Sequence, residues 1–133
     1  MVNNYVLLLC IGALALSSSC QSGGEVSPLA LYPSNPEGHS AKLQGSLKMD
    51  GGCLFILNDG GERWLAAFPS PGTSWDPEER SVQVNGKTLQ VGAKSGFVGG
   101  EITSGPGAIK WVQAPRAECD SSKIWLVNAL IEI

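Results

Sequence analysis

Short alternating segments of apolar and polar residues fill the chain after about residue 40. The segment 41–49 (AKLQGSLKM) alternates residue by residue, which is typical of a strand with one buried face. The segment 53–58 (CLFILN) is apolar almost throughout and predicts a strand buried on both faces. A third strand is expected over 62–69 (ERWLAAFP), because a proline ends that run. Glycine-rich turns separate these segments, as they do between consecutive short strands.

The segment 81–91 (SVQVNGKTLQV) carries the clearest local signal, which is that of a β-hairpin. Asn85-Gly86 is a preferred two-residue hairpin turn, because both residues tolerate positive φ. This turn sets Val82 opposite Leu89, and in that register the apolar residues of both strands share one face. Turn chemistry and hydrophobic pattern therefore predict the same hairpin.

Two further strands are expected towards the C-terminus. In 96–103 (GFVGGEIT) the glycine pair at 99–100 suggests a bulge or a sharp bend. In 123–133 (KIWLVNALIEI) a period of two places Trp125 on one face of the strand and Leu130 on the other.

This series of strands defines the expected fold class. No amphipathic helical segment of about 10 to 15 residues interrupts it, so a βαβ arrangement is not indicated. For residues 41–133 we expect an all-β fold, a small and partly open antiparallel barrel of about five or six strands, of the size of OB and SH3 domains. One disulfide would stabilise such a small core appreciably.

The N-terminal segment 1–19 (MVNNYVLLLCIGALALSSS) contains no charged side chain. Its apolar run, 5–16, is shorter than the roughly 20 residues that span a bilayer, and small residues follow it. Only the α-amino group of Met1 supplies the positive charge that signal peptides usually carry. We interpret 1–19 as a signal peptide, which makes the protein exported; a buried N-terminal helix is the alternative.

Four cysteines are distributed along the chain: Cys10, Cys20, Cys53 and Cys119. Cys20 directly follows LALSSS, which resembles a bacterial lipobox, where small residues precede a cysteine that receives lipid. Ser17 stands where the usual lipobox has leucine, and ordinary signal-peptidase cleavage after Ser19 is the alternative. We expect Cys20 to be the lipid-attachment residue of a protein anchored to a membrane of the cell envelope.

The number of cysteines that remain after cleavage bears on this choice. With Cys10 removed and Cys20 lipidated, Cys53 and Cys119 are left as one pair. With ordinary cleavage, Cys20 would instead be a free thiol in an oxidising compartment, in a soluble secreted or periplasmic protein. A disulfide between Cys53 and Cys119 would close a loop of about 65 residues.

Residues 20–40 have the composition of a linker. The stretch after Cys20 is rich in Pro, Ser and Gly and has no persistent apolar period, so a flexible tether is expected. A small apolar island at 29–32 could pack on the domain or serve as a recognition peptide. His39 is the only histidine of the chain, and we do not expect it to act as a ligand or a base.

Few residues offer catalytic or metal chemistry, and neither an enzyme nor a cofactor is expected. The motifs of serine hydrolases, zinc proteases and phosphate-binding loops are missing from the sequence. Two cysteines with one distant histidine do not make a metal site. Carboxylates cluster at Asp76, Glu78 and Glu79, a pattern that usually belongs to a solvated turn. The net charge of −3, with no basic block, argues against a nucleic-acid partner.

The tryptophans are the best candidates for ligand contacts. Trp64 and Trp125 fall in strand patterns and are expected in the core. Trp75 and Trp111 fall in expected loops, where each could plug the end of the barrel or stay exposed as an anchor for a glycan, peptide or protein. Trp75, Trp111 and the neighbouring Asp76 are therefore the candidate ligand-binding residues.

From about residue 45 onward the chain resembles small exported bacterial domains, many of them lipoproteins, that have no assigned activity. The resemblance rests on GSLKMDGGCLFI (45–56), FPSPGTSWD (68–76), VGAKSGFVGG (91–100) and Cys119 followed by IWLV (124–127). It implies a small β barrel with a Cys53–Cys119 bridge, and it carries over no catalytic residue.

The leading hypothesis is an exported, lipid-anchored envelope protein whose β domain is a binding or interaction module. Its partners would be a membrane, through Cys20, and an envelope protein or glycan. One alternative is a non-catalytic structural or protective surface protein. Another is a secreted enzyme or enzyme inhibitor that uses loop carboxylates; an enzyme would bring two of them together, for instance Asp76 and Glu101.

Overall fold

The computed structural model describes residues 27–34 and 39–133. The expected signal peptide at 1–19, the expected lipid-attachment residue Cys20 and the tether positions 21–26 and 35–38 lie outside the described residues. Within the described ranges, no helix is long and apolar enough to cross a membrane.

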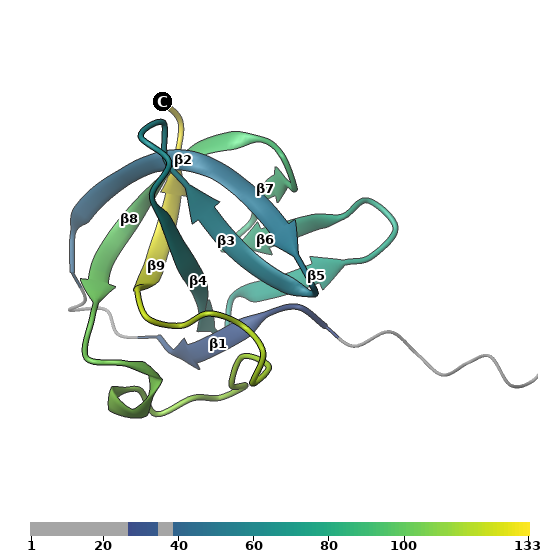
Figure 1. Ribbon diagram of the computed structural model, residues 1–133. Helices are drawn as coiled ribbons and strands as arrows, with labels where there is room; N and C mark the ends of the chain where they lie inside the picture. The colour runs from purple at the N-terminus through teal and green to yellow at the C-terminus, as the bar shows by residue number, and fades with distance from the viewer. Residues whose placement is uncertain (1–26, 35–38) are drawn as a thin grey trace, which may run out of the picture.

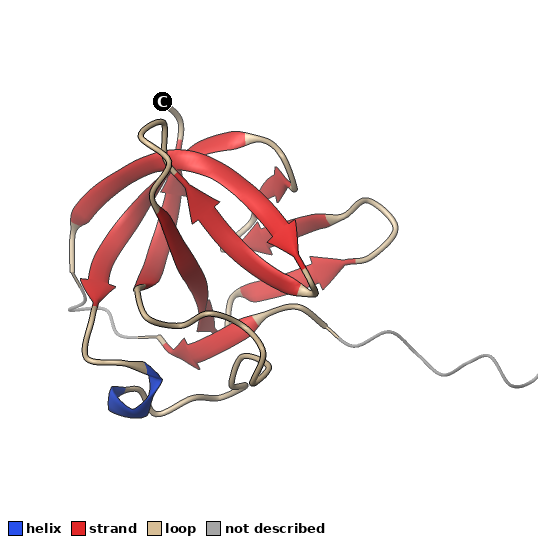
Figure 2. Cartoon of the chain, in the orientation of Figure 1, coloured by secondary structure: helices blue, strands red, loops and turns tan. Residues whose placement is uncertain are grey.

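Strands make up nearly all the regular structure of the described residues, as Figures 1 and 2 show. In chain order they are β1 (Ala30–Pro33), β2 (Ala41–Asp50), β3 (Cys53–Leu57), β4 (Arg63–Ser70), β5 (Thr73–Asp76), β6 (Ser81–Val84), β7 (Lys87–Gln90), β8 (Lys94–Ile102) and β9 (Ile124–Ile131). One 3₁₀ turn occupies Pro106–Ala108. The predicted all-β class is confirmed.

Five of the strands form a ring of backbone pairings. β2 pairs with β3, β3 with β4, β4 with β9, β9 with β8, and β8 with β2. The β4–β9 pairing is short and extends only from Leu65 opposite Ile124 to Ala67 opposite Leu126. The ring is therefore only partly bonded and is not a regular barrel. β1 lies outside the ring and pairs with β4.

Two of the pairings are parallel, which corrects the expected antiparallel arrangement. β4 runs parallel to both β1 and β9, whereas the other pairings of the ring are antiparallel. Parallel neighbours cannot be joined by a tight turn and need a long connection. The chain between β4 and β9 contains four other strands, so local turn signals do not reveal how these two strands run relative to each other.

The predicted hairpin is confirmed as β6–β7, part of a second sheet of three strands. Asn85 and Gly86 have φ values of 48° and 88°, and Val82 pairs with Leu89 as expected. β5 pairs with the other edge of β6, in a segment where the sequence predicts a loop. Its four residues are too short a run for the alternation to be recognised.

The larger hydrophobic core fills the interior of the ring. The β6–β7 hairpin packs against it through Val82, Val84 and Leu89. Trp64 and Trp125 lie in this core as predicted, with their ring centres 6.3 Å apart and their planes at 74°. Other fully buried members are Leu47, Leu54, Ile56, Phe68, Phe97 and Val127.

A second hydrophobic cluster lies on the opposite face of β3, β4 and β9. Its buried members are Tyr32, Cys53, Phe55, Leu65, Ala67, Cys119 and Ile124. The loop between β8 and β9 runs alongside this face (Figure 1), and its half-buried Trp111 packs against the cluster. The four residues 53–56 are each at most 4% exposed, so the predicted burial of this strand on both faces is confirmed.

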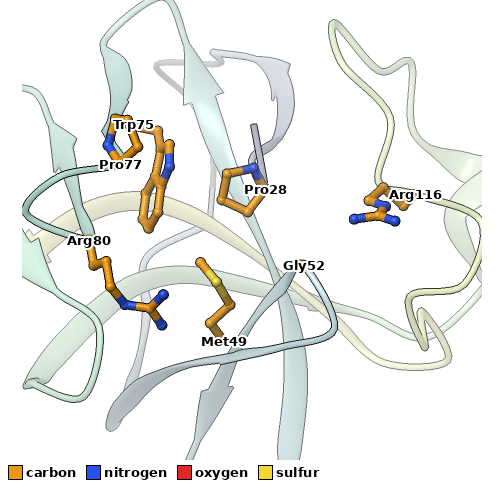
Figure 3. Close-up of a pocket in the computed structure, with 7 residues that line it drawn as sticks. All are labelled: Pro28, Met49, Gly52, Trp75, Pro77, Arg80 and Arg116. Carbon is orange, nitrogen blue, oxygen red and sulfur yellow. The ribbon is translucent and has the colours of Figure 1, made fainter. Parts of the chain in front are cut away.

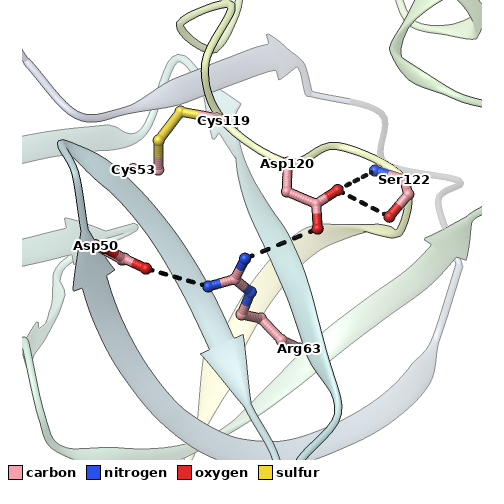
Figure 4. A network of polar contacts seen from close by, with 6 residues as sticks. All are labelled: Asp50, Cys53, Arg63, Cys119, Asp120 and Ser122. Carbon is pink, nitrogen blue, oxygen red and sulfur yellow. Dashed lines mark hydrogen bonds and ion pairs between the residues drawn. A yellow bond between two sulfur atoms is a disulfide. The ribbon is translucent and has the colours of Figure 1, made fainter.

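A disulfide joins Cys53 to Cys119 as predicted, and it ties the β8–β9 loop to the start of β3 (Figure 4). The two Cα atoms are 5.8 Å apart, and the two cysteines are 66 residues apart in the sequence. Closing a loop of that length stabilises the folded state by about 4 kcal/mol on the chain-entropy estimate.

Beside the disulfide, Arg63 of β4 lies between Asp50 and Asp120, at 3.3 Å and 3.7 Å from their carboxylates (Figure 4). Its guanidinium carbon is also 4.0 Å from the centre of the Phe55 ring. Hydrogen bonds from the backbone N–H and hydroxyl of Ser122 lower the pKa of Asp120. These groups are exposed, so the ion pairs contribute little to the stability of the fold. Their effect is to orient the loop after Cys119.

Part of the expected tether belongs to the sheet. Residues 30–33 form β1, and Tyr32 is 5% exposed. The Tyr32 hydroxyl lies 2.7 Å from the carbonyl oxygen of Val127 and 2.6 Å from Oδ1 of Asn128, and burial raises its pKa to about 12. The packed part of the chain therefore begins before residue 41, because the apolar island at 29–32 docks on the domain.

A β-bulge interrupts the pairing of β8 with β9 at the glycine pair where the sequence predicts one. Val98 pairs with Ala129 and Gly99 with Val127, so Asn128 has no partner in β8. The Asn128 side chain instead donates a hydrogen bond to the carbonyl oxygen of His39, at 2.6 Å.

The bulge also corrects the face predicted for the end of β9. Leu130 lies in the main core together with Trp125, whereas strict alternation places them on opposite faces. The extra residue in β9 shifts the alternation by one position, and a period-two reading of the sequence does not include that shift.

Gly99→Ala is expected to lower the free energy of unfolding by about 1–3 kcal/mol. A Cβ at Gly99 would overlap the carbonyl oxygen of Leu126 in β9. Gly107→Ala is the matched control, because nothing lies within 4 Å of the Cβ position there. Chemical denaturation measures both, and equal unfolding midpoints would contradict the close approach of β8 and β9.

Candidate functional site

A groove of about 380 Å³ lies between the three-stranded sheet and the β2–β3 turn (Figure 3). Its lining comes from separate parts of the chain: Pro28, Met49, Gly52, Trp75, Pro77, Arg80 and Arg116. In Figure 3, Arg80 and Arg116 lie on opposite sides of Met49 and Pro28. The groove therefore combines an apolar middle with a cation on either side.

Trp75 reaches the groove because of its register in β5. It pairs with Val82 of β6, so its side chain lies on the core-facing side of the three-stranded sheet. There it packs against the main core while remaining half-buried. One part of the indole thus packs on the core, and another part lines the groove.

The β2–β3 turn forms the facing wall. Met49 is partly buried and packs against the main core. Gly52 has a φ of 84°, and a Cβ at this position would collide with the guanidinium of Arg116. The missing side chain at Gly52 therefore allows Arg116 to lie against the turn.

Arg80 stands at the other side of the groove, directly before β6. Its φ of 51° lies in the left-handed region that residues other than glycine rarely adopt. Its carbonyl oxygen accepts the N–H of Val91 at 2.9 Å. Among the described residues its guanidinium has no ion pair, whereas Arg116 is paired with Glu118 at 3.2 Å.

The acids next to Arg80 in the sequence face away from the groove. Ser74 and Asp76 alternate with Trp75 along β5 and are exposed, and with Glu79 they line a different pocket on the outer side of the three-stranded sheet. Oδ1 of Asp76 accepts the backbone N–H groups of Glu78 and Glu79, at 3.0 Å and 3.2 Å. Asp76 therefore stabilises its own turn and does not line the groove of Trp75.

Trp111 lies elsewhere, in the β8–β9 loop. Its ring packs against the second hydrophobic cluster, and its Nε1 donates to the carbonyl oxygen of Pro106 at 3.0 Å. The structure thus does not bring the three candidate residues, Trp75, Trp111 and Asp76, into one site.

The carboxylates considered for catalysis lie in different sheets. Glu101, on β8, accepts a hydrogen bond from Nε1 of Trp64 at 3.0 Å, whereas Asp76 is held within its turn after β5. In the part of the chain that the structure describes, no three or more metal-binding side chains gather where they could hold an ion.

Sequence reasoning found one residue of the groove and missed its other members. Arg80 and Arg116 belong to different loops, and nothing in their sequence context signals that they border one hollow. Arg80 follows an acidic turn, and a charged residue in that position is typical of a solvated loop. The signal that identifies it is its backbone conformation, which only the structure supplies.

Comparisons with known proteins do not place the chain in a family. No family model matches it, and no match was found among curated proteins or solved structures. Function therefore has to be argued from the groove and the sequence.

Proposed function

We propose that this chain is an exported, lipid-anchored cell-envelope protein whose β domain is a binding module, with the Trp75 groove as its ligand site. The observation that carries the proposal is the half-buried Trp75 in a groove that also holds two arginines. Trp64 and Trp125 are only 7% and 6% exposed, whereas Trp75 keeps part of its side chain accessible in the groove, where a ligand could contact it.

The composition of the groove supports binding. Small-molecule sites are concave, largely apolar and supplied with a few polar groups, and this groove falls at the small end of their usual volumes. In protein–protein interfaces, tryptophan and arginine, together with tyrosine, are enriched among the residues that carry most of the binding energy. Trp75 offers a flat apolar surface, and the arginines offer charge and direction.

The strand order supports the same location by analogy of fold alone. The ring runs β2-β3-β4-β9-β8, and sheets of this kind in OB folds bind ligands near the loop between the first two strands and the loop between the last two. Here those two loops supply Gly52 and Arg116. The three-stranded sheet adds Trp75 and Arg80.

The expected anchor would keep this groove close to a membrane. Pro28 lines the groove and follows Cys20 by eight residues. A fully extended chain of that length spans at most about 28 Å. A lipid-anchored protein would therefore present the groove to partners near the membrane surface, such as an envelope protein or a glycan.

Lipidation at Cys20 predicts the N-terminal chemistry of the mature protein. Intact-mass analysis of the membrane fraction should find Cys20 as the first residue, with the added mass of acyl chains, because several chains are needed for stable anchoring. Cys20→Ser should release the protein from the membrane or leave its leader uncut. A mature N-terminus without acyl mass would remove the anchor from the proposal.

A binding role for the groove predicts that capture of an envelope component depends on Trp75. Tagged mature protein incubated with envelope extract should retain that component, and Trp75→Ala should reduce retention at least tenfold. Ser74→Ala is the matched control, because it alters the same strand on its outer face. Equal retention by both variants would favour the alternative of a structural or protective surface protein.

A further inference from the structure

Three acidic residues close to the groove in the sequence are held away from Arg80 by other contacts. Asp76 and Glu79 face the outer side of the three-stranded sheet, where Glu79 accepts a hydrogen bond from Gln90 at 3.5 Å. Asp50, at the end of β2, is bound to Arg63. Asp76, Glu79 and Asp50 are thus engaged elsewhere, and among the described residues the Arg80 guanidinium has no ion pair.

The backbone around Arg80 is well held although its φ is unfavourable. The Asp76 carboxylate fixes the turn that leads to Arg80, and the Val91 N–H fixes its carbonyl oxygen. Glycine or asparagine would suit a φ of 51° better than arginine does. An arginine kept in this conformation, at the border of a groove, is a strained position of the kind that gathers at binding sites.

The rest of the groove offers a flat apolar surface. The Trp75 indole lies with Pro77 on one side and with Met49 and Pro28 facing it (Figure 3). Such a slot suits a flat ring, because aromatic rings pair favourably with an indole in offset-stacked or edge-to-face arrangements. An arginine beside the slot would hold an oxyanion by charge-assisted hydrogen bonds.

We infer that the groove binds a ligand in which an oxyanion, phosphate or carboxylate, is joined to a flat apolar body. The apolar body lies against Trp75, and the oxyanion is held by Arg80. Arg116 borders the opposite side, where its charge is partly compensated by Glu118. The inference rests on the proposed function of the groove and adds the chemical class of its ligand.

Phenyl phosphate is the probe, because it joins the two groups that the groove is inferred to recognise. The mature protein, in a non-ionic detergent, is titrated with phenyl phosphate, with phenol and with inorganic phosphate. The indole N–H resonance of Trp75, identified by its loss in Trp75→Phe, reports on binding. Phenyl phosphate should shift this resonance and bind at least tenfold more tightly than either of its two parts.

Two variants assign the anion contact. Arg80→Gln should reduce the affinity for phenyl phosphate about tenfold, to that of phenol. Arg80→Gly should reduce the affinity by the same factor. Its Tm should be unchanged or higher, because glycine suits the backbone conformation at this position. Arg63→Gln is the control for loss of an arginine outside the groove, and it should leave the affinity unchanged.

Three results would overturn the inference: equal affinity for phenyl phosphate and phenol, equal affinity for phenyl phosphate and inorganic phosphate, or no shift of the Trp75 resonance. The first removes the anion contact and the second removes the apolar contact. If the resonance stays still while envelope capture still depends on Trp75, the ligand class is wrong and the proposed function stands. If the Trp75 resonance does not shift and envelope capture does not depend on Trp75, the groove is not a binding site.

Discussion

The short parallel pairing of β4 with β9 is the constraint on which the rest of the structure depends, because it turns an open sheet into a ring. Once the ring is formed, every second side chain of its strands must be apolar to fill the interior. The outer face of β3, β4 and β9 is apolar as well, and it would be exposed without a cover. Trp111 and Cys119 of the β8–β9 loop pack on this face, and the disulfide holds the loop in place. The bridge thus compensates for a sheet that is hydrophobic on both sides.

The groove follows from how the three-stranded sheet meets the ring. Val82, Val84 and Leu89 bury one face of this small sheet against the core, and Trp75 lies on the same face at its outer strand. Trp75 therefore cannot turn to solvent entirely, and it cannot be buried entirely either. The result is an aromatic surface on a strand, bordered by loops that the two sheets position, which is where binding residues commonly lie. The arginines come from two of those loops, so they could change without cost to the core.

Much of the strand pattern could be predicted from the sequence, because it depends on neighbouring residues. The hairpin at Asn85-Gly86 and the bulge at Gly99 follow from turn chemistry and from the glycine pair, and the double burial of 53–56 follows from an uninterrupted apolar run.

The direction of β9 relative to β4 could not be predicted, since it is decided by four intervening strands. The face of Leu130 was missed because a single extra residue, Asn128, reverses the alternation. β1 was missed because its four residues resemble an island within a linker. The groove could be predicted only as far as Trp75, since Arg80 and Arg116 meet it through tertiary structure and not through spacing.

The central claim is that the molecule meets its ligand on the Trp75 side of the three-stranded sheet, and site-specific photo-cross-linking in intact cells tests it most directly. A photoreactive residue would replace Pro77, which lines the groove, and in a second protein Ser74, which lies on the outer face of the same small sheet. The account predicts an adduct from position 77 that is missing or much weaker from position 74. Equal adducts from both positions, or an adduct from position 74 alone, would contradict it.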